Sequence, residues 1–217
     1  MKYYFSKSRT PSRDEYLIRL CAAKNVLHIG ACDAPYTRSK KETGLLLHEK
    51  ISAVANEVVG IDIDQEAIAL MQSYGFDNVI HFDMNCLDEL SFRPDVVIFG
   101  ETIEHLKDFS STFGNIRKVM QDNAVLVITT PNAFYFSNFI KALKGYESNH
   151  PEHTVFFSPR TLDYMLSSSG FEVTQRTFSF LDRKKERWPM RLKKTLLMRF
   201  PLLCETLIYE CRSGGMS

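Results

Sequence analysis

The sequence lacks any run of about 18 apolar residues, the length that a membrane-spanning helix needs. We expect no signal peptide either, because the short apolar stretch at the N-terminus is flanked by Lys2 and Lys7. No C-x-x-C pair is present, and the cysteines are odd in number: Cys21, Cys32, Cys86, Cys204 and Cys211. This pattern favours reduced structural thiols in a cytoplasmic protein over a disulfide framework.

The sequence also has little excess charge, with 27 Lys and Arg against 26 Asp and Glu and a net charge of +1. The chain as a whole therefore has no electrostatic preference for nucleic acid or anionic membranes, and any such preference must be local. Its 217 residues, 44% of them hydrophobic, can bury a substantial core. Because no repeat or low-complexity linker interrupts the chain, we expect one domain over residues 1–217.

Short β-branched runs alternate with longer amphipathic stretches. The runs predict strands at 25–29, 58–61, 78–82, 95–99, 124–129, 171–180 and 206–211, and the stretches predict helices at 14–23, 44–55, 65–74, 109–120 and 159–170. This alternation predicts an α/β, doubly wound, mostly parallel seven-stranded sheet. The last two runs alternate polar and apolar residues, so we expect two half-exposed strands that form an antiparallel edge of the sheet, including an antiparallel C-terminal strand.

A doubly wound sheet binds its ligand beyond the carboxyl ends of its strands. The first predicted strand runs into the small residues Gly30-Ala31-Cys32, which allow the backbone to approach a ligand closely. The second ends at Asp62, which can accept hydrogen bonds from both hydroxyls of a ribose, and the third at Asp83, which can bind an adenine amino group. Each feature alone also fits an ordinary turn, a solvated acid or a helix N-cap. Their regular recurrence favours a nucleotide site.

These residues resemble the motifs of the class I S-adenosylmethionine-dependent methyltransferases. The similarity extends over nearly the whole chain and rests on VLHIGACD (26–33), VGID (59–62), FD (82–83), FRPDVVIFGETIEHL (92–106) and VLVITTPNAF (125–134). It implies a Rossmann-like fold with S-adenosylmethionine as cofactor. The implied cofactor-binding residues are His28, Gly30, Ala31, Cys32, Asp33, Asp62, Ile63, Asp83, Met84 and Gly100.

Three residues depart from the pattern of that family. His28 stands where the family usually has an acid, and Cys32 and Ala34 replace glycines of its first motif. A non-catalytic binding protein with the methyltransferase fold is the alternative that these departures suggest. The missing G-x-G-x-x-G fingerprint argues against nicotinamide binding.

A cluster of acids and a histidine follows the fourth predicted strand as Glu101-x-x-Glu104-His105. If this segment is helical, the three side chains share one face. Together with the later His153, they resemble the metal-binding tetrad of small-RNA 2′-O-methyltransferases and the E-x-x-E-H of ubiquinone-pathway O-methyltransferases. The resemblance implies that Glu101, Glu104, His105 and His153 bind one divalent metal such as Mg²⁺ or Mn²⁺, with His150 as a competing ligand. Related enzymes also carry such residues without a metal.

The predicted reaction is methylation of a hydroxyl on a small molecule or glycan, in which Glu101 or His105 acts as catalytic base. We expect residues 131–159 to form the acceptor site. An RNA 2′-O-methyltransferase is the alternative, although the near-neutral charge argues against nucleic acid as a partner. A basic helical insert at about 182–204 is expected to pack on the sheet or on a second copy, with membrane contact through residues 183–200 as the alternative.

Overall fold

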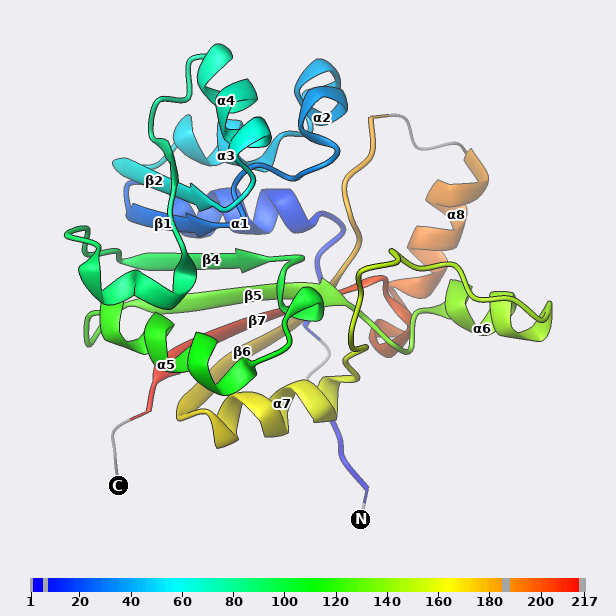
Figure 1. The fold of residues 1–217 in the computed structure, drawn as a ribbon. Coiled ribbons are helices and arrows are strands. Elements are labelled where there is room, and N and C mark those ends of the chain that lie inside the picture. The colour runs from blue at the N-terminus through cyan, green and yellow to red at the C-terminus, as the bar shows by residue number, and fades with distance from the viewer. Residues whose placement is uncertain (1, 6–7, 185–187, 215–217) are drawn as a thin grey trace.

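The computed structural model describes residues 2–5, 8–184 and 188–214 and contains one seven-stranded sheet (Figure 1). Its strands are β1 (Asn25–Ile29), β2 (Glu57–Asp62), β3 (Val79–His81), β4 (Val96–Gly100), β5 (Val125–Pro131), β6 (Phe171–Ser179) and β7 (Thr206–Ser213). They are ordered β3-β2-β1-β4-β5-β7-β6, and β7 is antiparallel to both of its neighbours. The predicted fold class is confirmed.

Helices cover both faces of this sheet (Figure 1). They are α1 (Arg13–Cys21), α2 (Thr37–Thr43), α3 (Leu47–Ser52), α4 (Gln65–Ser73), α5 (Phe109–Val119), α6 (Phe136–Leu143), α7 (Pro159–Ser168) and α8 (Trp188–Leu197), with 3₁₀ turns η1 (Met84–Glu89), η2 (Ile103–His105) and η3 (Pro201–Leu203). Since strand side chains alternate between faces, Val26 packs with α1 and α3, whereas Leu27 and Ile29 pack with α5 and α7. Every helix in the described part of the chain is too short or too polar to span a bilayer.

Helix boundaries follow local signals that the sequence contains. The side chain of Ser12 accepts a hydrogen bond from the amide of Glu15 and caps α1. Ser158 and Thr161 form a reciprocal capping box with Pro159 at the first position of α7. Gly75 has a φ of 88° just after α4, which fits its predicted place at the end of that helix.

The predicted helix at 44–55 is wrong in extent. Gly44 has a φ of 67° and ends α2, because its left-handed conformation terminates the preceding helix. The new helix begins only at Leu47 and ends at Ser52. The sequence analysis missed α2 because its residues, TRSKKET, carry no apolar periodicity.

The predicted antiparallel edge is confirmed, because β6 and β7 pair antiparallel at one end of the sheet, but the predicted half-exposure of β7 is wrong. Strand β7 lies between β5 and β6, and Leu207, Ile208 and Tyr209 are fully buried. Its polar residues suggested exposure, yet the Tyr209 hydroxyl donates a hydrogen bond to the Pro159 carbonyl oxygen at 2.9 Å. Burial of a polar side chain is tolerated when its hydrogen bonds are made, so alternation alone did not reveal this interior position.

The predicted basic insert at 182–204 contains α8 and η3, while its residues 185–187 lie outside the described part of the chain. Its apolar residues point in different directions. Leu197 is buried in the main core, as expected for packing on the sheet, but Leu192 and Leu196 are exposed.

Two buried histidines pack together between the first strand and α3. His28 on β1 stacks on His48 of α3, with ring centroids 5.5 Å apart and the two Nδ1 atoms 3.3 Å apart. Burial lowers the pKa of His48 to about 4. Burial, reinforced by His48, also lowers the pKa of His28 well below its usual value. Both rings are therefore neutral at neutral pH.

This pair makes the fold sensitive to acid. Below the ordinary histidine pKa of 6.5 the unfolded chain binds protons that the folded protein excludes, so stability is lost as the pH falls toward 4. In this interval we expect each of the two histidines to lower the free energy of unfolding of the wild type by up to about 1.4 kcal/mol for every pH unit. His28→Leu/His48→Leu should lose less, as measured by urea unfolding at pH 7 and pH 5. An equal pH dependence of the two proteins, with exposed His81→Leu as control, contradicts this account.

Candidate active site

The loop after β1 brings main chain close to the end of β4. Gly30 has a φ of 73°, and a Cβ atom at this position would lie 2.8 Å from the Thr102 hydroxyl. Both the left-handed backbone and the close contact therefore require glycine. The amides of Gly30 and Ala31 donate to the Ile61 carbonyl oxygen at 2.9 and 3.2 Å, which fixes the loop on β2.

Asp62 at the end of β2 fastens this loop. Its carboxylate accepts hydrogen bonds from the amides of Cys32, Ile63 and Asp64 at 3.0, 2.8 and 3.2 Å. The loop comes this close because Gly60 has no side chain, since a Cβ there would lie 2.8 Å from the Ala31 Cβ. The predicted loop and acid are thus directly hydrogen-bonded.

A cavity of about 440 Å³ opens beyond these strand ends. Gly30, Asp33, Asp62 and Gly100 of the predicted cofactor residues line it. The four predicted metal ligands line the same cavity, together with the competing His150: Glu101, Glu104, His105 and His153. The structure therefore brings the two predicted halves of the site into one pocket.

The other predicted cofactor residues have different surroundings. His28 faces His48 inside the fold, and Ala31 and Cys32 are buried in a small core cluster. Ile63 is exposed. Asp83 caps η1 by accepting a hydrogen bond from the Asn85 amide, and Met84 packs against the main core. Their cofactor contacts stay predictions.

The predicted helical face through Glu101 is wrong. The 3₁₀ turn η2 begins only at Ile103, and Glu101 precedes it with a φ of 50°. This left-handed conformation is unfavourable for glutamate, and such strain is often found at functional positions. The side chain still enters the pocket, where burial raises the pKa of Glu101 while the positive charge of Arg13 opposes the rise.

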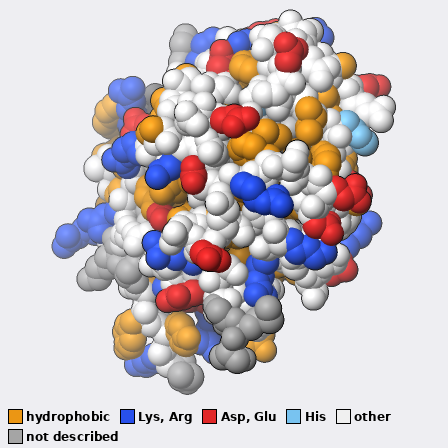
Figure 2. All heavy atoms as spheres, turned by 90° about the vertical axis from the view of Figure 1, so that its left-hand side faces the viewer, with side chains coloured by type: hydrophobic (Ala, Val, Ile, Leu, Met, Phe, Trp, Pro, Cys, Tyr) orange, Lys and Arg blue, Asp and Glu red, His pale blue; other side chains and the backbone are white. Residues whose placement is uncertain are grey.

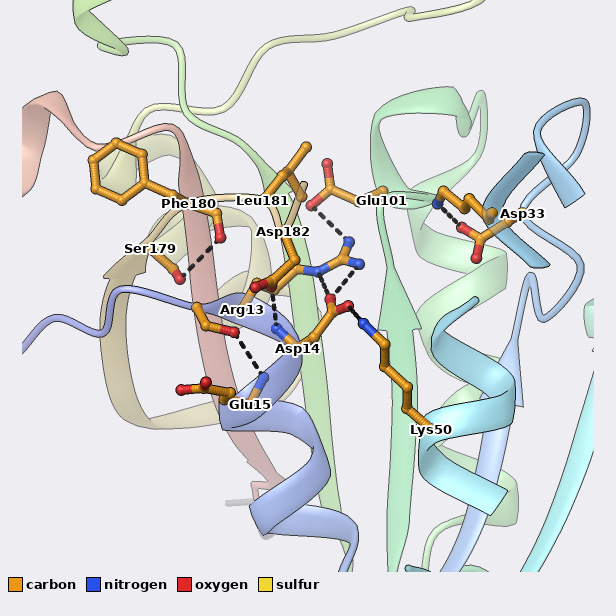
Figure 3. A network of polar contacts seen from close by, with 12 residues as sticks. Arg13, Asp14, Glu15, Asp33, Lys50, Glu101, Ser179, Phe180, Leu181 and Asp182 are labelled. Atoms are coloured by element: carbon orange, nitrogen blue, oxygen red, sulfur yellow. Dashed lines mark hydrogen bonds and ion pairs between the residues drawn. The ribbon is translucent and has the colours of Figure 1, made fainter. Parts of the chain in front are cut away.

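A buried ionic network that sequence analysis missed surrounds Glu101 (Figure 3). The Arg13 guanidinium donates to Asp14 at 2.8 Å and lies 3.8 Å from the Glu101 carboxylate. Lys50 donates to the other Asp14 oxygen at 2.6 Å, and Asp182 accepts from the Asp14 amide at 2.9 Å. Burial alone would raise the pKa of Asp14, but Arg13 and Lys50 lower it overall.

No local signal could have revealed this network. Arg13 and Asp14 occupy the first turn of α1, where charged residues are usually solvated, and only the tertiary contacts with Glu101, Lys50 and Asp182 bury them.

Glu104 is buried below the pocket, with 2% of its surface exposed. One carboxylate oxygen accepts a hydrogen bond from the Thr130 hydroxyl at 2.9 Å, and the other lies 3.9 Å from His153 Nε2. Burial and the nearby charge of Glu101 raise the pKa of Glu104 to about 8. In the metal-free protein this side chain is therefore mostly protonated at neutral pH.

Three histidines gather at the pocket wall. One ring nitrogen from each of His105, His150 and His153 lies within 4.8 Å of the others. Thr154 fixes the loop that carries the last two, because its amide and hydroxyl donate to the Glu104 carbonyl oxygen at 2.8 and 3.0 Å. The sequence had offered His150 only as a competitor of His153, whereas the structure places both beside His105.

The histidine cluster has the chemistry of a metal site. Burial and the neighbouring imidazoles lower the pKa of His105 and of His153, so that neutral rings are favoured, as metal coordination requires. The buried His153 Nδ1 has no hydrogen-bond partner within the described residues, while its Nε2 faces Glu104. A ligating histidine typically directs its second nitrogen to a carboxylate in this way.

The raised pKa of Glu104 predicts that the protein loses stability as the pH rises from 5 to 8. The unfolded chain releases this proton near its ordinary pKa of 4.5, whereas the folded protein retains it up to about 8, so stability decreases as the pH rises between these values. With chelator present, Glu104→Gln should lose on the order of 2 kcal/mol less than wild type between pH 5 and pH 8. Urea unfolding measures this difference, and exposed Glu172→Gln serves as control. Parallel curves for Glu104→Gln and wild type would show that Glu104 ionises normally.

The strand order and the pocket at the strand ends define a class I methyltransferase fold. The family model described as "Methyltransferase domain" matches residues 22–176, and the chain belongs to this family. The class predicted from the sequence motifs is thereby confirmed.

Among curated proteins, the chain is similar to the "Ubiquinone biosynthesis O-methyltransferase" of Rhodopseudomonas palustris, with 25% identity over 173 residues that cover 74% of this chain and 67% of the relative. A "Probable S-adenosylmethionine-dependent methyltransferase" of Mycobacterium tuberculosis is 28% identical over 153 residues. That match covers 70% of this chain but only half of the longer relative.

Solved structures support the fold at low sequence identity. A SAM-dependent methyltransferase from Archaeoglobus fulgidus has a TM-score of 0.58 at 19% identity, covering 91% of this chain and 90% of the other. The magnesium protoporphyrin IX methyltransferase of Synechocystis, solved with bound SAH, has a TM-score of 0.57 at 12% identity, covering 93% and 82%.

Proposed function

We propose that this protein is an S-adenosylmethionine-dependent O-methyltransferase that acts on a hydroxyl of a small molecule or glycan with the help of a divalent metal. One observation carries the proposal: the loop fastened by Asp62 opens into the same pocket as Glu101 and the histidine cluster. The curated relatives named as ubiquinone O-methyltransferases support oxygen as the methylated atom.

The cofactor would lie along the strand ends. We assign its methionine part to the loop at Gly30–Asp33, its ribose to Asp62 and Ile63, and its adenine to Asp83 and Met84. Gly100 borders the same pocket and leaves room for the reacting end of the cofactor. Asp62 suits its role because its carboxylate is held in place by three amides before any ligand arrives.

The metal would be held by His105 and His153 with Glu104 beside them, and Glu101 or His150 would complete the set. Imidazole nitrogens suit Fe²⁺ or Zn²⁺, whereas the carboxylate oxygens of Glu101 and Glu104 suit Mg²⁺ or Mn²⁺. When bound, the cation lowers the pKa of an acceptor hydroxyl and fixes its oxygen.

The protein's own groups complete the reaction. The methyl group passes from the cofactor sulfur to the hydroxyl oxygen, which breaks a carbon–sulfur bond, forms a carbon–oxygen bond and leaves S-adenosylhomocysteine. The hydroxyl proton goes to Glu101 or His105. Arg13 favours the charged form of Glu101 that can accept it. Residues Tyr135, Asn138 and Phe156 of the predicted acceptor region line a smaller cavity that includes Glu101 and His153.

Calorimetric titration with S-adenosylhomocysteine tests the cofactor site. Loss of hydrogen bonds to a carboxylate costs about 1.5–3 kcal/mol, so Asp62→Asn should weaken binding roughly 10- to 100-fold. The same change at the neighbouring helix cap, Asp64→Asn, should leave affinity nearly unchanged, because asparagine also caps helices. A folded wild type that does not bind would favour the non-catalytic alternative.

Titration of the chelated protein with Mn²⁺ and Zn²⁺ tests the metal site. We expect His105→Ala and His153→Ala each to weaken binding at least about tenfold, because each removes a nitrogen ligand of the proposed site. Comparison of Glu101→Gln with His150→Ala identifies the last ligand, and His81→Ala on β3 is the control. If wild type binds neither ion, metal assistance is refuted while cofactor binding can still stand.

A further inference from the structure

Helix α8 carries a row of apolar side chains on its solvent-facing side. Trp188, Leu192 and Leu196 follow one another at intervals of four residues and are 74%, 56% and 63% exposed, and Phe200, just beyond the end of the helix, is 54% exposed. The interval places the first three along one side of the helix. Leu197 is buried in the core, so the exposed row is additional to the apolar contact that anchors the helix.

Helix α6 adds a second exposed apolar row. None of its residues is buried, and Phe139 and Leu143, one turn apart, are both exposed. Phe134 before the helix and Tyr146 after it are exposed as well. Of α6 itself, Phe136 packs partly buried against the main core, and exposed apolar side chains gathered like these normally mark a contact beyond the domain.

The two helices form one surface on the side toward which β4 and β5 point (Figure 1). The Lys193 ammonium of α8 donates to the Ser137 hydroxyl and lies 4.9 Å from the ring centre of Tyr135, at the start of α6. A groove between α6 and η3 continues the surface and is lined by Phe134, Phe136, Phe139, Leu202 and Leu203. We call this region the α6–α8 surface.

The charge of the α6–α8 surface has a single sign. Segments 132–146 and 188–204 contain no Asp or Glu, and all of their charged residues are basic: Lys141, Lys144, Arg191, Lys193, Lys194 and Arg199. Arg191 and Arg199 are exposed beside the apolar row of α8. On the face at the left of Figure 1, by contrast, acidic and basic side chains are interspersed (Figure 2). The near-neutral chain thus concentrates positive charge where its apolar side chains are exposed.

We propose that the α6–α8 surface docks on a membrane of anionic phospholipids. The apolar row enters the interface between headgroups and acyl chains, and the basic side chains contact the lipid phosphates. A second copy of the chain fits less well, because symmetric association would bring the two basic surfaces together. RNA would use the positive charge but not the exposed leucines, since it is bound through aromatic stacking and phosphate contacts.

Docking would bring the candidate active site to the membrane. Tyr135, Asn138 and Lys141, at the start of and along α6, also line the cavity beside Glu101 and His153. An acceptor hydroxyl at headgroup depth would therefore be close to the pocket entrance. This consequence rests on the proposed function, whereas the docking itself does not.

The only tryptophan of the chain, Trp188, reports directly on docking. We expect the full-length protein to co-sediment with phosphatidylglycerol–phosphatidylcholine vesicles and its fluorescence to shift to shorter wavelength on binding. Partition should be at least about tenfold weaker for pure phosphatidylcholine and should decrease with added salt.

Paired variants separate the two contributions. Leu192→Ser/Leu196→Ser and Arg191→Glu/Arg199→Glu should each reduce partition at least about tenfold. Tyr164→Ser removes an exposed apolar side chain elsewhere, and Arg19→Glu/Lys24→Glu makes the same change in net charge on another part of the surface. These controls should bind vesicles like wild type. Thermal melts and S-adenosylhomocysteine titrations establish that each variant is folded.

Four results would overturn the proposal. The proposal is refuted if the wild type does not bind anionic vesicles. It is also refuted if the control variants lose as much vesicle binding as the α6–α8 variants. A wild-type dimer that Leu192→Ser/Leu196→Ser makes monomeric, without any vesicle binding, would identify an interface between copies. Binding of single-stranded RNA that depends on Arg191 and Arg199, again without vesicle binding, would identify a nucleic-acid surface.

Discussion

The pocket depends on a buried positive charge, the guanidinium of Arg13. It joins α1 to Glu101 at the end of β4 and to Asp14, which in turn binds Lys50 of α3 and Asp182 (Figure 3). A buried charge is tolerated only when it is paired, and removal of one partner typically costs about 3–5 kcal/mol. The position of Glu101 and the course of the chain at Asp182 are therefore coupled through this network.

Around this network, burial sets the protonation of the site. Burial raises the pKa of Glu104, which favours its neutral acid form. It lowers the pKa of His105 and of His153, which favours their neutral imidazole form. The pocket therefore carries fewer charges than its residues suggest. A divalent cation would restore the ionised carboxylate and occupy the unpaired nitrogen of His153. In the proposed metal site, the burial that raises the pKa of Glu104 is thus also what would favour a bound cation.

Helices α6 and α8 contribute little to the core of the fold. The two large core layers are built mainly by α1, α3, α5 and α7, whereas, among the described side chains, α6 adds only the partly buried Phe136 and α8 only the buried Leu197. The exposed apolar side chains of α6 and α8 therefore lie next to the predicted acceptor region at 131–159. The membrane proposal and the enzymatic proposal therefore concern neighbouring parts of one end of the sheet.

The sequence by itself determined the parallel sheet, the glycine loop with Asp62, and the E-x-x-E-H segment, because strand and helix periods are local and parallel strands place their carboxyl ends at one edge. Only the tertiary structure decided that Arg13 meets Glu101, that His150 joins His105 and His153, and that β7 lies inside the sheet. Those contacts join residues far apart in the chain. Their formation depends on packing and on the pairing of buried charges, which no local pattern records.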